Sequence, residues 1–290
     1  MLTLKQPQRL TASHSTIPQL SSALARGDDG IWYADRQAEI SHPEVCQDWY
    51  REVEDRSYWF KHRANCLVDL LRRFPPQGAI FDIGGGSGVM SLAMLRAGVA
   101  PVLVEPSQAA AASARSRGLR DVICSTLQDA QFHEGCLPAA AMFDVLEHIQ
   151  YQRQILTDVA AALKPGGRLY ITVPAYSWLW SEHDDNVGHF RRYTTGALRR
   201  ALRDSGFDVE HASYIFAPLT LPILLMRSLP YRILGGGRAT QQSFAKEHAT
   251  DGGPLSRAMD WLLRLERWWA RHRFPIPLGS SCIAVAHKHL

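Results

Sequence analysis

An apolar segment at residues 79–83 runs directly into a turn that is rich in glycine. The glycines are Gly84, Gly86 and Gly88. Glycine adopts positive φ angles without strain and leaves room for a ligand beside the main chain. About 17 residues further on, a second apolar segment ends in Glu105, whose carboxylate could accept hydrogen bonds from both hydroxyls of a ribose. A strand, a glycine turn and a following helix open many nucleotide-binding α/β sheets, so these residues predict a cofactor that contains a ribose.

The spacing of the glycines separates two classes of cofactor. A dinucleotide fingerprint is Gly-x-Gly-x-x-Gly, whereas here the third glycine comes one residue early and Val89 takes its usual place. The spacing argues against NAD, and an NAD-dependent oxidoreductase is kept as the enzymatic alternative. The run from Asp82 to Gly88 instead resembles the Asp-x-Gly-x-Gly-x-Gly motif of the class I S-adenosylmethionine-dependent methyltransferases, whose second motif ends in an acid like Glu105.

Two further motifs of that family follow in the expected order. Phe-Asp-Val-Leu-Glu-His occupies 143–148, and Leu-Lys-Pro-Gly-Gly occupies 163–167. The resemblance extends over residues 59–195 and, more loosely, over 278–281. It implies an enzyme that transfers a methyl group from S-adenosylmethionine, on a Rossmann-like α/β fold whose seven-stranded, mostly parallel sheet has the order 3-2-1-4-5-7-6, an antiparallel seventh strand and helices on both faces. A non-catalytic binding module on the same fold is a further alternative, and the intact motifs argue against it.

The same resemblance implies a role for each residue near the cofactor. Asp82 would hold the glycine turn or the ammonium group of the cofactor, and Glu105 would bind the ribose. Thr126 and Leu127 would lie beside the adenine. Arg63 would neutralise the methionyl carboxylate, and its alternative role is that of a solvated surface arginine. The complete expected set is Arg63, Asp82, Gly84, Gly86, Gly88, Glu105, Thr126, Leu127 and Phe143.

Methyl transfer is a displacement at a carbon that positive sulfur already activates, so the main task of the enzyme is to align the acceptor. A base is required only when the acceptor is a hydroxyl or a protonated amine. Residues 176–193 follow an expected strand at 168–173 and carry two histidines together with several acids and arginines. Ligands of open α/β sheets bind beyond the carboxyl ends of the strands. His183 or His189 could therefore act as the base, oriented by Asp184.

The same segment contains the groups expected to bind the acceptor. It resembles a Trp-Ser-x-His-Asp-x-x-x-Gly-His-x-Arg-Arg-Tyr pattern in a little-characterised methyltransferase subgroup, many members of which are found beside glycan or lipid synthesis genes. Arg191 and Arg192 would grip an anionic group of the acceptor, and Tyr176 and Tyr193 complete the expected substrate-binding set. The alternative is a lid whose polar groups satisfy one another.

A second polar cluster follows the expected strand at 139–144. Asp144, Glu147 and His148 fall at i, i+3 and i+4, so they would share one side if the chain has turned into a helix. The ubiquinone-pathway O-methyltransferases have a similar Glu-x-x-Glu-His that is associated with a divalent cation, but here the first acid is Asp. We therefore predict no metal and place His148 among the catalytic candidates. The alternatives are a cation on these three residues, or a purely structural role in bracing the loop. Zinc is disfavoured, because no thiolate accompanies the histidines.

The composition is that of a globular protein. Of the 290 residues, 46% are hydrophobic and 21% are charged, which excludes wholesale disorder. The net charge of +4 does not demand nucleic acid, and no Asn-Pro-Pro-Tyr motif for a flipped base is present. The five cysteines show no Cys-x-x-Cys spacing, which predicts free thiols in a reducing cytoplasm. Neither a leader nor a spanning segment is expected. The expected partner is a small-molecule or lipid-linked substrate, and the oligomeric state stays open.

Four regions are expected along the chain. Residues 1–30 are polar and predict a flexible tail, and 31–214 predict the methyltransferase core. The core should contain a helix at 57–74, stopped by two prolines, and strands near 79–83, 101–105, 121–124, 139–144, 168–173 and 208–214. Residues 215–278 predict a helical insertion before the last core strand, which lies in 279–290.

The insertion, about 64 residues long, exceeds a plain connection. Its second half predicts a helix from Pro254, with arginines around it. Leu255, Met259, Leu262 and Trp269 fall on one face of this helix. Two interpretations stay open. The helix could cap the mouth of the active site with a solvated basic outer face, or its tryptophans and arginines could make peripheral contact with the inner face of a membrane.

Overall fold

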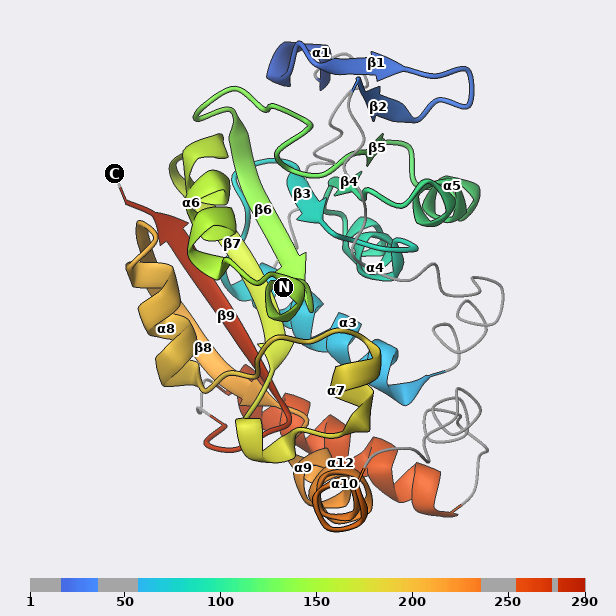
Figure 1. Ribbon diagram of the computed structural model, residues 1–290, viewed down its shortest axis with the longest axis vertical. Helices are drawn as coiled ribbons and strands as arrows, with labels where there is room; N and C mark the ends of the chain where they lie inside the picture. Colours follow the sequence, from blue (N-terminus) through green and yellow to red (C-terminus); the bar gives the residue numbers. More distant parts are fainter. Residues whose placement is uncertain (1–16, 36–56, 236–253, 273–275, 290) are drawn as a thin grey trace, which may run out of the picture.

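The structure, a computed structural model, describes residues 17–35, 57–235, 254–272 and 276–289. They form one sheet with helices around it (Figure 1). The strands are β1 (Leu24–Arg26), β2 (Trp32–Ala34), β3 (Ile80–Ile83), β4 (Pro101–Val104), β5 (Val122–Cys124), β6 (Leu137–Phe143), β7 (Leu163–Pro174), β8 (Phe207–Ile215) and β9 (Ser281–Lys288). The helices are α1 (Ile17–Leu20), α3 (Tyr58–Arg73), α4 (Val89–Arg96), α5 (Gln108–Ser116), α6 (Gln152–Ala162), α7 (Glu182–Asn186), α8 (Thr195–Arg203), α9 (Ala217–Ile223), α10 (Leu229–Leu234) and α12 (Pro254–Arg271).

The sheet has nine strands in the order β1-β2-β5-β4-β3-β6-β7-β9-β8. From β5 to β8 this is the predicted order, and β9 is antiparallel to both of its neighbours, as expected of the seventh strand. The expected number of strands is wrong, because β1 and β2 extend the sheet beyond β5, with β2 parallel to β5 and β1 antiparallel to β2.

The two additional strands also change the expectation of a flexible tail over residues 1–30. Residues 1–16 lie outside the described part of the chain, but α1 and β1 are formed from residues assigned to the tail. Ile17, Leu24 and Trp32 are buried in the same core cluster as Phe81. These apolar residues are too widely spaced among polar ones to show a period, so only their contact with the sheet reveals them.

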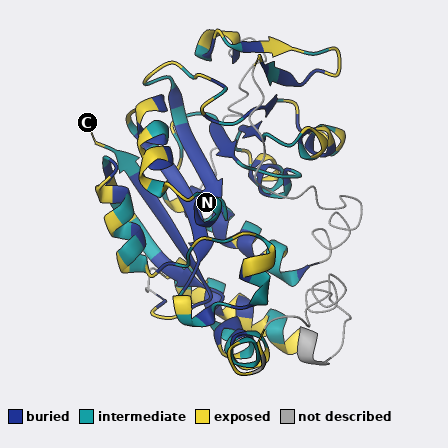
Figure 2. Ribbon diagram, in the orientation of Figure 1, coloured by how far each residue is buried: buried dark blue, intermediate teal, exposed yellow. Residues whose placement is uncertain are grey.

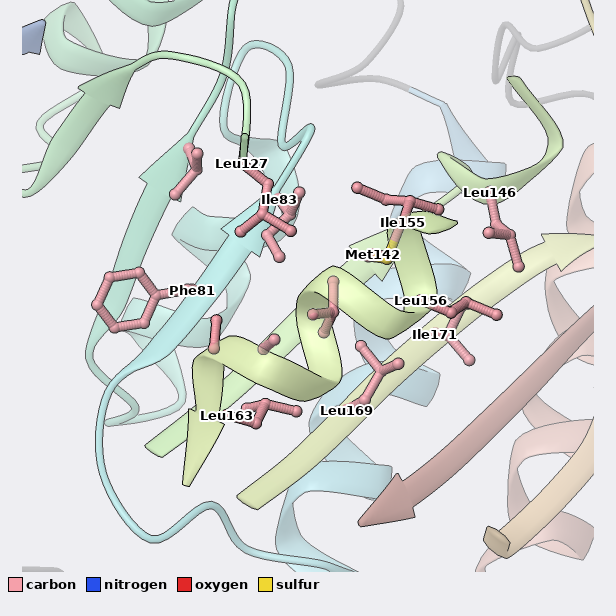
Figure 3. Close-up of a cluster of buried hydrophobic side chains, with 14 of the residues drawn as sticks. Phe81, Ile83, Leu127, Met142, Leu146, Ile155, Leu156, Leu163, Leu169 and Ile171 are labelled. Carbon is pink, nitrogen blue, oxygen red and sulfur yellow. The ribbon is translucent and has the colours of Figure 1, made fainter. Parts of the chain in front are cut away.

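Side chains of the central strands alternate between two cores. Phe81 and Met142 belong to the cluster that includes residues of α6, whereas Ile80 and Ala141 belong to the cluster that includes residues of α3 and α4. Figure 3 shows the first cluster, where α6 lies over β6 and β7. Figure 2 shows that the central strands are buried along almost their whole length. Helices therefore cover both faces of the sheet, as parallel strands require.

Helix α3 follows the prediction closely. Ser57 is its N-cap and accepts a hydrogen bond from the backbone N–H of Trp59. The helix ends at Arg73, and the two prolines that follow cannot continue it. Because α3 packs beside α4, it brings the residues near its start toward the glycine turn.

The insertion lies at one end of the molecule, where α9, α10 and α12 group together (Figure 1). Between α9 and α10 the chain forms a π-helical segment, η3 (Leu224–Ser228). Glu266 of α12 is buried and accepts hydrogen bonds from the backbone N–H groups of Phe216 and Ala217, at 2.8 and 2.5 Å. Oε1 of Glu266 also lies 2.9 Å from Nε2 of His62 on α3. One carboxylate thus ties α12 to α3 and to the start of α9.

The sequence placed four apolar residues on one face of α12 without deciding whether that face packs inward. Leu262 and Trp269 are exposed, and Leu263 and Glu266 are buried instead. The side chain of Leu255 lies outside the described part. Among the described helices, none is long and apolar enough to cross a membrane. Four cysteines are free thiols, and Cys46 falls outside the described residues.

Candidate active site

The glycine turn after β3 opens into a cavity of about 290 Å3. Gly84, Gly86 and Gly88 all have positive φ, at 71°, 55° and 82°. A Cβ added at Gly86 would have no atom within 4 Å, so the turn leaves open space at that point. A Cβ at Gly85, by contrast, would meet the side chain of Leu103 at 2.3 Å. The turn is therefore packed on one side and open toward the cavity on the other.

Asp82 stands at the carboxyl end of β3 and lines the cavity. It is fully buried, and its Oδ2 accepts a hydrogen bond from Ser91 Oγ at 2.7 Å. Its Oδ1 has no partner among the described groups. Burial raises the pKa of Asp82 to about 6. A buried acceptor without a partner, next to an open glycine turn, is the arrangement that a ligand with an ammonium group fits.

Glu105 lies behind the turn rather than in the cavity wall. One carboxylate oxygen accepts from the backbone N–H of Gly86 at 2.9 Å and the other from that of Ser107 at 2.8 Å. Burial raises the pKa of the Glu105 carboxyl. Each oxygen retains a second lone pair, so Glu105 can brace the turn and still accept from a ribose. That contact stays a prediction.

The expected adenine contacts are not brought to this cavity. Leu127 is buried in the core cluster with Phe81 and Ile83 (Figure 3). The hydroxyl of Thr126 donates to Asp129 Oδ2 at 2.8 Å and accepts from the backbone N–H of Asp129 at 3.0 Å. Neither residue lines the cavity beside the glycine turn.

Arg63 reaches the cavity from α3 and pairs with Asp144. The guanidinium is largely buried and lies over the rings of Trp59 and Phe60, 5.8 and 5.6 Å from their centroids. Asp144 has a positive φ of 54° directly after β6, and it also accepts from the hydroxyl of Thr172 at 2.9 Å. Phe143 lines the same wall. The solvated alternative for Arg63 is thereby excluded.

Residues after β7 form the opposite wall, and Asp184 organises them. This carboxylate is fully buried and accepts from the Ser181 backbone N–H at 2.9 Å. His189 Nδ1 lies 2.7 Å from Oδ1, and Arg192 donates to both oxygens at 2.7 and 2.9 Å. Burial alone would raise the pKa of Asp184, but hydrogen bonds from His189 and Arg192 hold this pKa well below its usual range.

Glu147 and His148 meet His189 from the other side. They lie in the 3-10 turn η1 (Leu146–His148) after β6. The rings of His148 and His189 are 4.7 Å apart, and Glu147 Oε1 lies 4.0 Å from His189 Nε2. Both carboxylate oxygens of Glu147 are buried without a hydrogen-bond partner in the described structure. Burial, and secondarily the charge of Asp144, raise the pKa of Glu147 well above its usual value.

Donor atoms of Glu147, His148 and His189 lie within 4.8 Å of one another, which is close enough for a cation to bind. Asp144, the acid that the sequence would add to this set, is instead neutralised by Arg63. The sequence suggested a cluster of Asp144, Glu147 and His148. In the structure His189 takes the place of Asp144, because it comes from a loop that is distant in the chain.

The expected substrate-binding residues divide into two groups. Arg192 lines the cavity, but its guanidinium is committed to Asp184 and to the carbonyl of Ala175 at 3.2 Å. Arg191 donates to the carbonyl of Gln150 at 2.6 Å, and the Tyr193 hydroxyl donates to Gln152 at 2.8 Å. Tyr176 is stacked against Trp178 and Tyr214. Arg191, Tyr193 and Tyr176 do not line the cavity.

Several wall residues have no signal in the sequence that would single them out. Ile223 and Arg227 of the insertion, Val187 after α7 and Ser280 before β9 all border the cavity. His183 lines it as well, with its ring 6.2 Å from that of His189. These side chains come from segments far apart in the chain, and only the strand order brings them together.

Comparison with known proteins identifies the family of this chain. A family model described as a methyltransferase domain matches residues 58–212. A probable S-adenosylmethionine-dependent methyltransferase of Mycolicibacterium smegmatis is 22% identical over 167 residues, which are 57% of this chain and 65% of that protein. The ubiquinone biosynthesis O-methyltransferase of Xanthomonas axonopodis pv. citri is 29% identical over 107 residues, which are 34% of this chain and 45% of that protein. The chain thus spans less than two thirds of either relative.

Solved structures share the fold at low identity. The [4+2]-cyclase SpnF is 19% identical with a TM-score of 0.53, and the match covers 84% of this chain and 93% of that one. Phosphoethanolamine N-methyltransferase 2 of Haemonchus contortus is 17% identical with a TM-score of 0.52, covering 84% and 56%. The family model covers more than half of this sequence. The chain therefore belongs to the methyltransferase domain family, and its predicted membership of the class I S-adenosylmethionine-dependent methyltransferases is confirmed.

Proposed function

We propose that this protein transfers the methyl group of S-adenosylmethionine to an oxygen or nitrogen of a small-molecule acceptor of lipid or glycan type. One observation carries the proposal: the open glycine turn and His189, which is paired with Asp184, line the same cavity. The residues assigned here to the methyl donor and to the proton of the substrate thus come from separate strands and meet at one cavity. That separation is what alignment of a donor and an acceptor requires.

On the donor side, Asp82 and the glycine turn hold the methionyl part, and Glu105 keeps the turn in place through Gly86. S-adenosylmethionine, when bound, supplies a methyl group that its positive sulfur activates. Arg63 is already paired with Asp144, so its attraction for the carboxylate of a ligand is weakened. We assign to Arg63 and its two aromatic neighbours the role of closing this wall against water.

On the acceptor side, His189 takes the proton of a hydroxyl or ammonium through Nε2. Asp184 accepts the hydrogen bond from Nδ1 and stabilises the positive charge that the ring gains. Arg192 is a positioning residue, because it holds Asp184 in the ionised form by two hydrogen bonds. His183 and Arg227 border the remaining space and would contact the acceptor itself.

The test has two steps. Calorimetry should show binding of S-adenosylmethionine and of S-adenosylhomocysteine but not of NADH. The protein is then incubated with tritiated S-adenosylmethionine and an extract that has been separated into organic and aqueous fractions. The His189→Gln variant serves as the control for transfer. Label in a low-molecular-weight product supports the proposal. Binding of NADH alone would make the protein an oxidoreductase, and cofactor binding without label in either fraction would indicate a non-catalytic binding module.

A further inference from the structure

Helix α12 carries its apolar residues on the side that faces away from the protein. Trp261, Trp268 and Trp269 are 63%, 52% and 47% exposed. At 100° per residue these positions share one side with Leu262 and Leu265, opposite the buried Leu263. We call this set of five residues the outer stripe. A surface helix ordinarily shows polar side chains there, and an apolar surface of this kind marks a contact with a partner or a membrane.

Arginines lie along one edge of the outer stripe. By the same helical geometry, Arg257 and Arg264 fall between the outer stripe and the side that packs inward, and both are exposed. Arg267 and Arg271 come next and pair with Asp69 of α3. The helix therefore has three sectors in sequence around its axis, which are buried, mainly cationic and apolar, with Asp260 as the one acid among the four arginines of the second sector.

A second cavity, of about 500 Å3, lies beside the cationic sector, between α3, α12 and β8. Its charged lining residues are Arg72, Arg73, Arg267, Arg271 and Asp69, so four positive charges face one negative charge. His211 adds none at neutral pH, because burial lowers its pKa to about 4. The side chain of Arg72 is 67% exposed, so the cavity opens to the surface. We call it the arginine cavity.

We propose that this end of the molecule docks on a bilayer that contains anionic phospholipid, with the outer stripe in the interface and a lipid phosphate in the arginine cavity. Tryptophans with flanking arginines are the side chains that suit the boundary between headgroups and acyl chains. Arginine binds phosphate oxygens through two parallel N–H groups. A protein partner would account for the outer stripe, but an anionic surface accounts for both the stripe and the excess of positive charge beside it.

Other apolar side chains of the insertion are also exposed at this end of the molecule (Figure 1). Leu225 and Met226 on η3 and Ile233 on α10 are 53%, 72% and 76% exposed. Arg227, next to them, borders the active-site cavity. A membrane under α10 and α12 would thus lie close to the mouth of that cavity. The inference concerns where the enzyme works and is independent of which acceptor atom it methylates.

The experiment measures co-sedimentation of the full chain with vesicles. Vesicles of phosphatidylcholine with phosphatidylglycerol should retain the protein at about 0.1 M salt and release most of it at about 1 M, since salt screens the arginines. Pure phosphatidylcholine vesicles should bind about tenfold less, because they lack the attraction of the anionic lipid. Trp261→Ser with Trp268→Ser should abolish sedimentation, while calorimetry with S-adenosylmethionine shows an intact fold and an unchanged cofactor site.

Arg72→Gln with Arg73→Gln tests the arginine cavity without disturbing the pairs that Asp69 makes with α12. This variant should bind phosphatidylglycerol vesicles about tenfold more weakly. A matched control, Arg153→Gln with Arg203→Gln, removes the same charge from exposed positions on α6 and α8 and should change binding less than about twofold. An equal loss in both pairs would refute the cavity as a phosphate site.

Three other outcomes would overturn the proposal. The wild-type protein could fail to sediment with phosphatidylglycerol vesicles at either salt concentration. Light scattering could show a dimer that the Trp261→Ser, Trp268→Ser variant converts to a monomer, which would assign the outer stripe to a second copy of the chain. Inorganic phosphate could quench the tryptophan fluorescence of the protein although vesicles do not bind, which would make the arginine cavity a site for a free anion.

Discussion

His189 Nδ1 lies 2.7 Å from Oδ1 of Asp184, and the ring edge that carries Nε2 faces Glu147 and the cavity. Because Asp184 is held in the ionised form by Arg192 as well, the hydrogen bond places the ring proton on Nδ1 and leaves Nε2 as the acceptor. This pair links the middle of the five-residue helix α7 to the loop that follows it.

The first prediction separates the two histidines. His189→Gln should lower turnover at least about 100-fold, as expected for a lost general base, and leave the affinity for S-adenosylmethionine nearly unchanged. His183→Gln should cost less turnover and should mainly raise the KM of the acceptor. Initial rates and calorimetry provide the measurements. A parallel loss of cofactor affinity in His189→Gln would place the loop in the cofactor site instead.

The second prediction concerns the glycine turn. Gly86→Ala and Gly98→Ala introduce the same strain, because both glycines have positive φ, 55° and 83°, and open space around a Cβ. Each should destabilise the protein by about 1 kcal/mol. Only Gly86→Ala should weaken binding of S-adenosylmethionine, since only Gly86 lines the cavity. Thermal melts and calorimetry of both variants test this, and equal affinity in the two would remove the turn from the cofactor site.

The third prediction concerns the pH dependence of stability. Burial raises the pKa of Asp82 to about 6, so the folded protein binds this proton more tightly than the unfolded chain does. The stability that the proton contributes is full below about pH 4 and is lost as the pH rises through 6. Asp82→Asn removes this loss. The free energy of unfolding of Asp82→Asn, relative to wild type, should therefore increase between about pH 4 and pH 8, by on the order of 3 kcal/mol.

Denaturant titrations of both proteins across this pH range provide the measurement. Ser91→Ala is a control that removes the hydrogen bond to Asp82 but keeps the carboxyl group. Superimposable pH profiles for wild type and Asp82→Asn would contradict the assignment of a raised pKa. Loss of S-adenosylmethionine binding in Asp82→Asn, without loss of stability at pH 8, is expected in parallel.

The fourth prediction is that Mn2+ does not bind at Glu147, His148 and His189 with useful affinity. A cation there would have to displace a proton from a carboxyl group whose pKa burial raises. Calorimetry with MnCl2 should show no saturable heat, and a chelator should leave activity unchanged. Saturable binding that disappears in Glu147→Gln would instead establish a metal site.

The fifth prediction concerns the anchor of the insertion. Glu266→Ala leaves the buried N–H groups of Phe216 and Ala217 without their acceptor, which should destabilise the protein by about 2 to 4 kcal/mol. Glu266→Gln retains one acceptor oxygen and should cost less. Denaturant unfolding of both variants tests the order, and a Glu266→Ala variant as stable as wild type would show that α12 does not depend on this carboxylate.

Much of the fold follows from short-range patterns in the sequence. Continuous apolar runs such as the one ending at Asp82 predict buried parallel strands, and the seven core strands lie where these runs are. The glycine turn was also predictable, because positive φ restricts the residue type at each position. Both properties depend on neighbours within a few residues, so they can be found without knowledge of the rest of the chain.

Other features depend on contacts between distant segments. The strands β1 and β2 form because Leu24 and Trp32 meet the core beside β5, and no local period announces them. The buried side of α12 could not be predicted, since several faces of this helix are apolar and only contact with α3 and α9 decides which one packs. The ion pairs of the site also depend on contacts between distant segments, so they could not be read from local patterns.

The sequence by itself determined the family, the cofactor motif and the residues able to do chemistry. Only the tertiary structure decided that Arg63 pairs with Asp144, that Arg192 binds Asp184, and that His189 lines the same cavity as the glycine turn, because charge pairing and burial depend on distances that the strand order sets.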